Sequence, residues 1–174
     1  MLENLLRCIA LPACSNYNVI AADEYDLVSF DTFPILIVAN TGKRPLGLHW
    51  YGVLIQLCGT RVDVEIFDPL ALDLKKHHKV ALPFKPNKVN KVRIQSDQSD
   101  KCGDFVLMFF HYKLRGYSTS QFLAMFHHDQ LEKNDLIVNK FILKLKRSCL
   151  QLKTCRLPRI GCTSWINNPL CIKQ

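Results

Sequence analysis

The segment from Ser99 to Gly103 contains the best candidate for a nucleophile, Cys102, which glycine and a long apolar stretch follow. The apolar stretch predicts a helix from Cys102 to about Leu114, with Gly116 as its stop. Backbone N–H groups in the first turn of such a helix point at the sulfur, and the helix dipole favours the thiolate, which is the nucleophilic form. Gly103 would leave the sulfur open to a substrate.

A thiol nucleophile needs a general base, and His49 is the candidate. His49 lies in the run Gly47-Leu48-His49-Trp50, where a loop enters a predicted strand, and Asp68 ends the following strand. Adjacent antiparallel strands of similar length would bring His49 and Asp68 together, so that the carboxylate orients the ring and stabilises its imidazolium form. Gln95, seven residues before Cys102, could join the Cys102 backbone N–H in an oxyanion hole.

The elements that must position these residues form an α+β pattern, with a small central mixed sheet and helices on both sides. A capping-box pair, Ser118 and Gln121, predicts the start of one helix, and Gly59 predicts a hairpin turn between two strands. The expected helices span about Leu2–Ile9, Cys102–Leu114, Ser118–His128 and Asp135–Cys149, and the expected strands span Pro34–Asn40, Trp50–Leu57, Arg61–Phe67 and Lys91–Ile94.

Length and composition suit one globular domain: 174 residues, 48% hydrophobic and 22% charged. No apolar run is long enough to cross a bilayer, and the first fourteen residues do not form a convincing signal peptide. We therefore expect a soluble intracellular protein, monomeric and without a membrane partner. Its eight cysteines are then expected to be mostly reduced thiols.

The net charge of +8 is concentrated in the C-terminal part of the chain. Residues 136–174 contain eight Lys or Arg and no acidic residue, and residues 75–93 contain seven Lys or Arg and no acidic residue. Such basic segments suit a nucleic-acid partner, although solvated faces and a soluble tail explain them equally well.

No metal site is expected. The cysteines of the basic tail, at positions 149, 155, 162 and 171, lack the tight Cys-x2-4-Cys pair that a zinc site usually shows. The adjacent pairs His77-His78 and His127-His128 diverge on a helix or a strand, so neither pair makes a chelate by itself.

The stretch from about Tyr17 to Phe141 resembles the adenovirus-type maturation proteases (adenain-like), whose relatives include proteases of large DNA transposons and, more distantly, the SUMO-specific proteases. The order His49, Asp68, Gln95, Cys102 is the order of that family. The His49-Trp50 pair, the Phe67-Asp68-Pro69 segment and the Cys102-Gly103 pair before an apolar helix also match it.

The resemblance implies a papain-like cysteine endopeptidase that cuts viral or transposon-encoded precursor proteins, such as capsid or core proteins, beside glycine. Trp50 would roof the narrow site, and Gly47 and Gly103 would also contact the substrate. The protease domain would span residues 1–148, followed by a basic, cysteine-containing tail at 149–174. No cofactor is required, the resemblance implies DNA, a short viral peptide or both as activators, and the protein would work in the host nucleus and the virion.

Two other functions stay open. The same fold could process ubiquitin-like modifiers of the host, which probes with a diglycine tail would reveal. The chain could instead be a non-enzymatic module that binds DNA through its basic tail, in which case salt-sensitive binding would survive the substitution Cys102→Ala.

Overall fold

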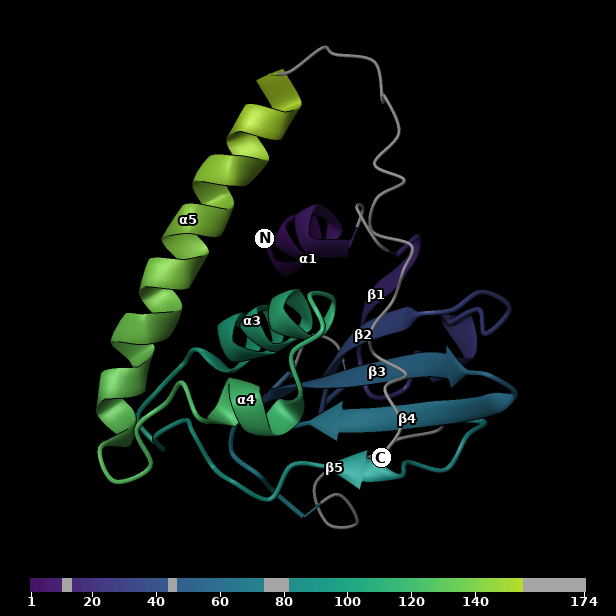
Figure 1. The fold of residues 1–174 in the computed structure, drawn as a ribbon, viewed down its shortest axis with the longest axis horizontal. Coiled ribbons are helices and arrows are strands. Elements are labelled where there is room, and N and C mark those ends of the chain that lie inside the picture. The colour runs from purple at the N-terminus through teal and green to yellow at the C-terminus, as the bar shows by residue number, and fades with distance from the viewer. Residues whose placement is uncertain (11–13, 44–46, 74–81, 155–174) are drawn as a thin grey trace.

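The computed structural model describes residues 1–10, 14–43, 47–73 and 82–154 as a mixed α/β structure with a five-stranded sheet. Figure 1 shows the α-helices gathered on one side of that sheet. The helical elements are α1 (Leu2–Ala10), η1 (Tyr25–Leu27), α3 (Cys102–Lys113), α4 (Thr119–Leu123), η2 (Leu131–Lys133) and α5 (Asn134–Thr154), where η marks a short 3-10 helix. The strands are β1 (Asn16–Ile20), β2 (Ile35–Asn40), β3 (Trp50–Cys58), β4 (Arg61–Phe67) and β5 (Lys88–Val89).

The sheet is mixed and has the strand order β1-β2-β3-β4-β5. The outer pairs β1–β2 and β4–β5 are parallel, and the inner pairs β2–β3 and β3–β4 are antiparallel. A two-residue turn joins β3 to β4, where Gly59 adopts a positive φ of 63°, as the sequence predicted for a hairpin. The hairpin is the element that brings its two open ends, residues 49 and 68, side by side.

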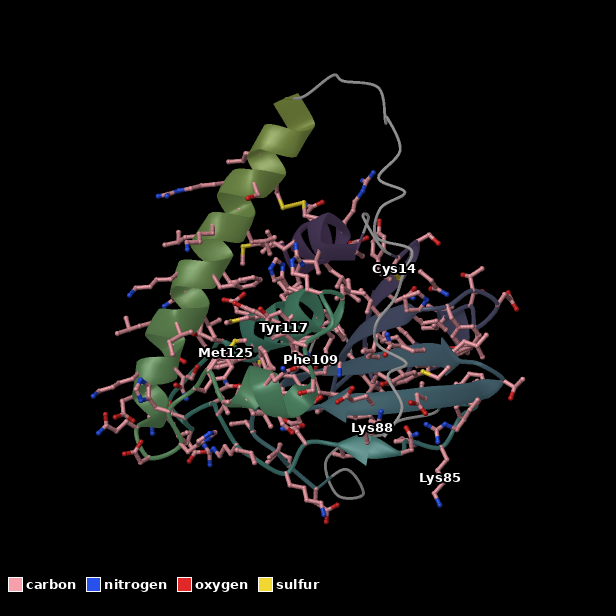
Figure 2. The ribbon with its side chains drawn as sticks, viewed as in Figure 1. Cys14, Lys85, Lys88, Phe109, Tyr117 and Met125 are labelled. Carbon is pink, nitrogen blue, oxygen red and sulfur yellow. A yellow bond between two sulfur atoms is a disulfide. The ribbon has the colours of Figure 1, made fainter. Side chains whose placement is uncertain are left out.

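The main hydrophobic core lies between the sheet and the helices α1, α3, α4 and α5. Helix α3 is buried on most of its surface, and its Phe109 stacks on Phe67 of β4 with 4.4 Å between the ring centroids. Figure 2 shows Phe109 among the side chains near α3. Gly52 of β3 makes this approach possible, because a Cβ atom there would lie 2.9 Å from Val106 of α3. Helix α3 is therefore fixed against the centre of the sheet.

The expectation of α-helices on both sides of the sheet is wrong for the part of the chain described here. The second face, formed by side chains such as Ile37 and Val53, is covered by η1 and by irregular chain carrying Phe30, Phe33 and Phe84. These aromatic side chains cover the second face of the sheet in place of an α-helix. They lie in segments whose composition is typical of loops.

Several element boundaries also differ from the expected ones. The strand expected at Lys91–Ile94 is absent, and the short β5 lies just before it at Lys88–Val89. Helix α4 starts at the predicted capping box but ends at Leu123 rather than near His128. Helix α5 continues to Thr154, so the domain boundary expected after residue 148 falls inside a helix.

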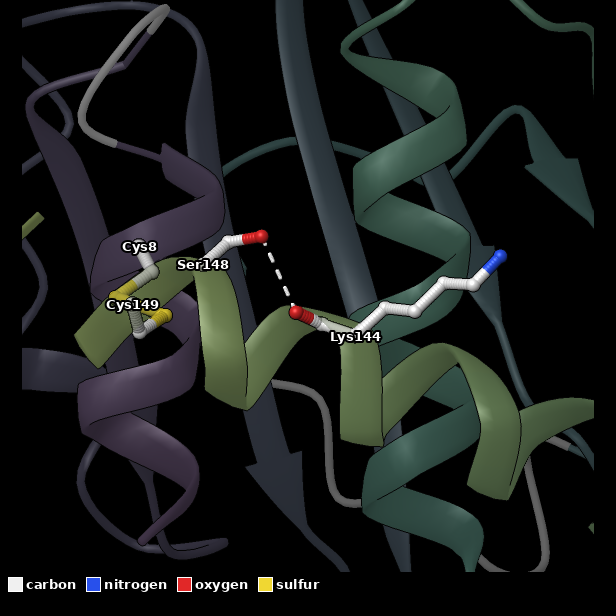
Figure 3. Close-up of a disulfide and its surroundings, with 4 residues drawn as sticks. All are labelled: Cys8, Lys144, Ser148 and Cys149. Atoms are coloured by element: carbon white, nitrogen blue, oxygen red, sulfur yellow. Dashed lines mark hydrogen bonds between the residues drawn. A yellow bond between two sulfur atoms is a disulfide. The ribbon is translucent and has the colours of Figure 1, made fainter. Parts of the chain in front are cut away.

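Cys8 and Cys149 form a disulfide between α1 and α5, whereas the sequence led us to expect reduced thiols (Figure 3). Their Cα atoms are 5.9 Å apart, and the two residues are separated by 141 positions in the chain. Of the remaining cysteines, Cys14, Cys58 and Cys102 are not part of this disulfide, and those at 155, 162 and 171 fall outside the described residues. The bond ties the first helix to the last one.

Replacing both Cys8 and Cys149 with alanine should lower the free energy of unfolding by about 2–5 kcal/mol, because the bond closes a long loop in the unfolded chain. Urea unfolding without reductant measures the difference between this variant and the wild type. Dithiothreitol should destabilise the wild type and leave the double variant unchanged. Equal unfolding midpoints without reductant would contradict the prediction.

Within the described ranges, no helix combines the length and the apolar character that crossing a bilayer requires.

Candidate active site

Cys102 is the first residue of α3 and is buried, with 8% of its surface exposed. Lys101 occupies the N-cap position, and its side chain makes no capping hydrogen bond. The backbone N–H groups of the first turn therefore face the region of the sulfur without a side-chain cap, as the sequence predicted. The placement of Cys102 at a helix N-terminus is confirmed.

Gly103 has a packing role that the sequence did not indicate. A Cβ atom at Gly103 would lie 2.9 Å from the side chain of Leu2, so the absence of a side chain lets α1 approach the nucleophile turn. The expected contact of Gly103 with a substrate stays a prediction.

His49 immediately precedes β3 and is brought to both of its expected partners. Its Nε2 lies 2.7 Å from Oδ1 of Asp68. The Cys102 side chain lies close enough to raise the pKa of the imidazole. Because Asp68 takes Nε2, Nδ1 is the ring nitrogen that remains for Cys102. Next in the chain, the backbone N–H of Trp50 donates to the Cys102 sulfur at 3.4 Å. The predicted meeting of His49, Asp68 and Cys102 is thus present in the structure.

The β3–β4 hairpin explains this meeting. Phe67, the last residue of β4, pairs with Gly52 near the start of β3, so the residues flanking this end of the hairpin, His49 and Asp68, lie on the same edge. Helix α3 packs across β3 with its N-terminus at that edge, which adds Cys102. A backbone hydrogen bond from Thr41 N–H to the carbonyl of His49 at 2.9 Å fixes the loop before the strand.

The site raises the proton affinity of His49. Burial by itself would lower the pKa of the imidazole, but hydrogen bonds to Asp68 and Cys102, together with their charges, outweigh burial and raise the pKa to about 9. His49 is therefore an imidazolium at neutral pH. The stability that this proton contributes is fully present below the ordinary histidine pKa of about 6.5 and is lost as the pH rises through about 9.

Asp68 is fully buried and receives hydrogen bonds from several directions. Its Oδ1 accepts from His49 and also from the backbone N–H of Leu70 at 2.8 Å. Its own backbone is held by the side chain of Asn90, which accepts from Asp68 N–H and donates to Asp68 C=O, both at 2.7 Å. The carboxylate is consequently fixed toward the imidazole ring.

Gln95 is buried beside the Asp68-Pro69 turn, since its backbone N–H donates to the carbonyl of Pro69 at 3.1 Å. Its side-chain Nε2 donates to the carbonyl of Ser99 at 2.8 Å, inside the loop that leads to Cys102. Hydrogen bonds of the described residues do not join Gln95 to Cys102. The role of Gln95 in an oxyanion hole therefore stays a prediction, with the side chain in the expected loop.

The loop before His49 depends on Asn40, a residue that sequence reasoning did not select. The Asn40 side chain is buried, and its Oδ1 accepts from the backbone N–H groups of Gly42 at 2.9 Å and Leu48 at 3.1 Å. Gly47 lies against it so closely that a Cβ atom there would be 2.5 Å from Asn40 Nδ2. Gly47 thus allows the loop to close on Asn40, and its expected contact with substrate stays a prediction.

The acidic residues that flank the nucleophile loop are paired with neighbouring cations. Asp97 contacts Arg93 at 2.5 Å, and Asp100 contacts Lys101 at 2.9 Å. These ion pairs reduce the repulsion that the carboxylates would exert on a thiolate at Cys102.

No group of three or more His, Cys, Asp or Glu side chains is arranged for a metal ion among the residues whose positions are described. The His77-His78 pair lies outside those residues, while His127 and His128 are both exposed.

The site brings a thiol, an imidazole and a carboxylate together, and the imidazole is protonated at neutral pH. Such an arrangement can produce a thiolate for attack on a carbonyl carbon. No protein-family model matches the chain, and no curated protein matches its sequence significantly, so the resemblance to the adenovirus-type maturation proteases rests on the residues themselves.

Proposed function

We propose that this chain is a cysteine endopeptidase of the adenovirus-type, papain-like class. The observation that carries the proposal is the position of His49, whose Nε2 lies 2.7 Å from the buried Asp68 and whose next residue, Trp50, donates its backbone N–H to the Cys102 sulfur at 3.4 Å. The types, the chain order and the local structure of these three residues agree with a Cys-His-Asp triad.

In the proposed reaction, Nδ1 of His49 holds the proton of Cys102 while the thiolate attacks the carbonyl carbon of the scissile peptide bond. Hydrogen bonds from the Cys102 backbone N–H and the Gln95 side-chain amide stabilise the negative charge on the carbonyl oxygen. The imidazolium then gives its proton to the leaving amine, and a thioester to Cys102 forms. Water attacks the thioester with His49 as base, which releases the carboxylic acid and regenerates the Cys102 thiolate beside the His49 imidazolium.

The substrate class follows from the resemblance and from Trp50. This residue begins β3 beside the nucleophile, and its half-buried side chain packs against the main core. The resemblance implies that this indole roofs the narrow site and leaves little room for a side chain before the scissile bond, so that cleavage occurs next to glycine. The natural substrates would be viral or transposon-encoded precursor proteins, cut during capsid maturation in the host nucleus and the virion.

A nucleic-acid partner is supported by the outer surface of α5. Lys140, Lys144 and Arg147 are exposed on this helix, and no acidic residue follows Asp135 in the chain. The second basic segment, 75–93, is described only from residue 82 onward. DNA bound along these cations would act as an activator, and its binding would weaken as salt increases.

Incubation with candidate capsid precursors, followed by mass mapping of the cut sites, tests the proposal. Cuts beside glycine in the wild type and none with Cys102→Ala are expected. A chain that leaves the precursors intact but reacts through Cys102 with diglycine-tailed modifier probes would instead process ubiquitin-like modifiers. Salt-sensitive DNA binding without thiol chemistry at Cys102 would overturn the proposal in favour of a binding module.

A further inference from the structure

Nine polar or charged residues are buried in the described part of the chain, and three of them are asparagines. His49, Asp68 and Gln95 belong to the candidate site, while Asp63, Glu65 and Lys113 form ion pairs. The asparagines are Asn40, Asn90 and Asn134. A buried amide is costly unless its hydrogen bonds are made, so three of them in a small core call for a physical explanation.

Each of the three asparagines bonds the backbone next to a different candidate site residue. Asn40 holds the loop that leads into His49, through Leu48 N–H at 3.1 Å. Asn134 donates to the carbonyl of Ile94, the residue before Gln95, at 2.8 Å and also bonds both backbone groups of His127.

Asn90 hydrogen-bonds both backbone groups of Asp68, so among the three asparagines it contacts its site residue most directly. Its Oδ1 accepts from Asp68 N–H and its Nδ2 donates to Asp68 C=O, both at 2.7 Å, and Nδ2 also donates to Val92 C=O at 3.1 Å. Strand β4 ends at Phe67, so the Asn90 amide replaces the strand neighbour that Asp68 would otherwise lack. All three of these hydrogen bonds are made to backbone atoms.

We propose that Asn90 is a positioning residue for the Asp68–His49 pair, an inference that rests on the proposed function. The Asn90 side chain hydrogen-bonds backbone atoms of Asp68 and Val92, and these bonds fix the backbone from which the Asp68 carboxylate reaches Nε2 of His49. A displacement of about 1 Å in such a group can reduce the rate about 10²-fold. The proton affinity of His49 depends on the same distance, because Asp68 provides the hydrogen bond and the charge that raise it.

Asn87 offers a matched control on the same sheet edge. Its side chain accepts from Val64 N–H and donates to Asp63 Oδ1, both at 2.9 Å, and these contacts are made to β4 away from the site. Substitution of Asn87 removes a similar set of hydrogen bonds without touching Asp68. A purely structural role for Asn90 predicts equal effects of the two substitutions on His49.

The test is the NMR titration of the His49 ring in the full chain, carried out for the wild type, Asn90→Ala and Asn87→Ala, with His49→Ala to assign the signal. We expect the pKa of His49 to fall from about 9 toward the ordinary value of about 6.5 in Asn90→Ala and to stay near 9 in Asn87→Ala. Asn90→Ser, which retains one polar side-chain group able to form a hydrogen bond, should give an intermediate pKa and replaces the alanine variant if that variant does not fold.

An unchanged His49 pKa in Asn90→Ala or Asn90→Ser, or an equal fall in Asn87→Ala, would overturn the inference. Peptide-bond cleavage measured on the same samples separates the two proposals. If His49 titrates as expected but the wild type cleaves no precursor, the proposed function fails while the positioning of Asp68 by Asn90 stands. If both hold, Asn90→Ala should lower kcat more than it changes KM.

Discussion

The substitution His49→Ala is expected to lower the alkylation rate of Cys102 at pH 7 by about ten- to thirtyfold, because an ordinary cysteine is only a few per cent thiolate at that pH. In the proposed mechanism, the His49 imidazolium stabilises a charged sulfur at Cys102, and alanine removes both the positive charge and the proton acceptor. Iodoacetamide labelling followed by peptide mass mapping gives the rate at Cys102. Precursor cleavage should fall further, by about 10²–10⁴-fold, since His49 also protonates the leaving amine.

His111 provides a control for this substitution. It is a half-buried histidine on the same helix as Cys102, and burial together with Arg115 lowers its pKa to about 4, so it is neutral at pH 7. His111→Ala should therefore leave the labelling of Cys102 unchanged. A loss of reactivity in His111→Ala as large as that in His49→Ala would show that loosening of α3, and not loss of the base, causes the effect.

The substitution Asp68→Asn should lower cleavage at pH 7.5 by about 10²-fold, within the range that positioned acid–base groups contribute. It keeps the shape of the side chain but removes the negative charge that raises the pKa of His49, so burial would then lower that pKa. The wild type should lose activity as the pH rises through about 9, where the imidazolium is deprotonated. In the variant, this alkaline limit should move to lower pH.

Asp63→Asn is the matched control, since Asp63 lies on β4 and pairs with Arg61 and Lys88 away from the site. It should change stability and leave the alkaline limit in place. The measurement is the pH–rate profile of the wild type and of both variants on one peptide substrate, from which the alkaline limits of activity are compared. An alkaline limit that is the same in the wild type and in Asp68→Asn would mean that Asp68 does not control the protonation of His49.

The parts of the fold that the sequence predicted are those with strong local signals. The apolar run after Cys102 and the glycine at 116 defined α3 within one residue of its observed end, and Gly59 marked the hairpin. Because a short hairpin fixes which strand ends meet, the approach of His49 to Asp68 could also be inferred. The papain-like relationship itself stays a proposal.

The features that the sequence did not predict depend on contacts between distant segments. Strand β5 pairs in parallel with β4, and no local pattern reveals which residues near Lys88 will find that partner. Helix α4 ends earlier than expected. A few residues after it, the side chain of Asn134 accepts a hydrogen bond from the backbone N–H of His127. The Cys8–Cys149 disulfide joins residues 141 positions apart. Asparagine is common in loops, so its presence at 40 and 90 carried no signal.

The most direct test of the central claim compares two cysteines of the wild-type chain that are outside the disulfide. Cys58 is partly exposed and Cys102 is buried, so accessibility alone predicts that iodoacetamide labels Cys58 faster. A thiolate stabilised by His49 reverses this order. The rates of labelling at pH 7, measured without reductant by peptide mass mapping, should show Cys102 reacting faster than Cys58. Faster labelling of Cys58 would contradict the assignment of Cys102 as an activated nucleophile.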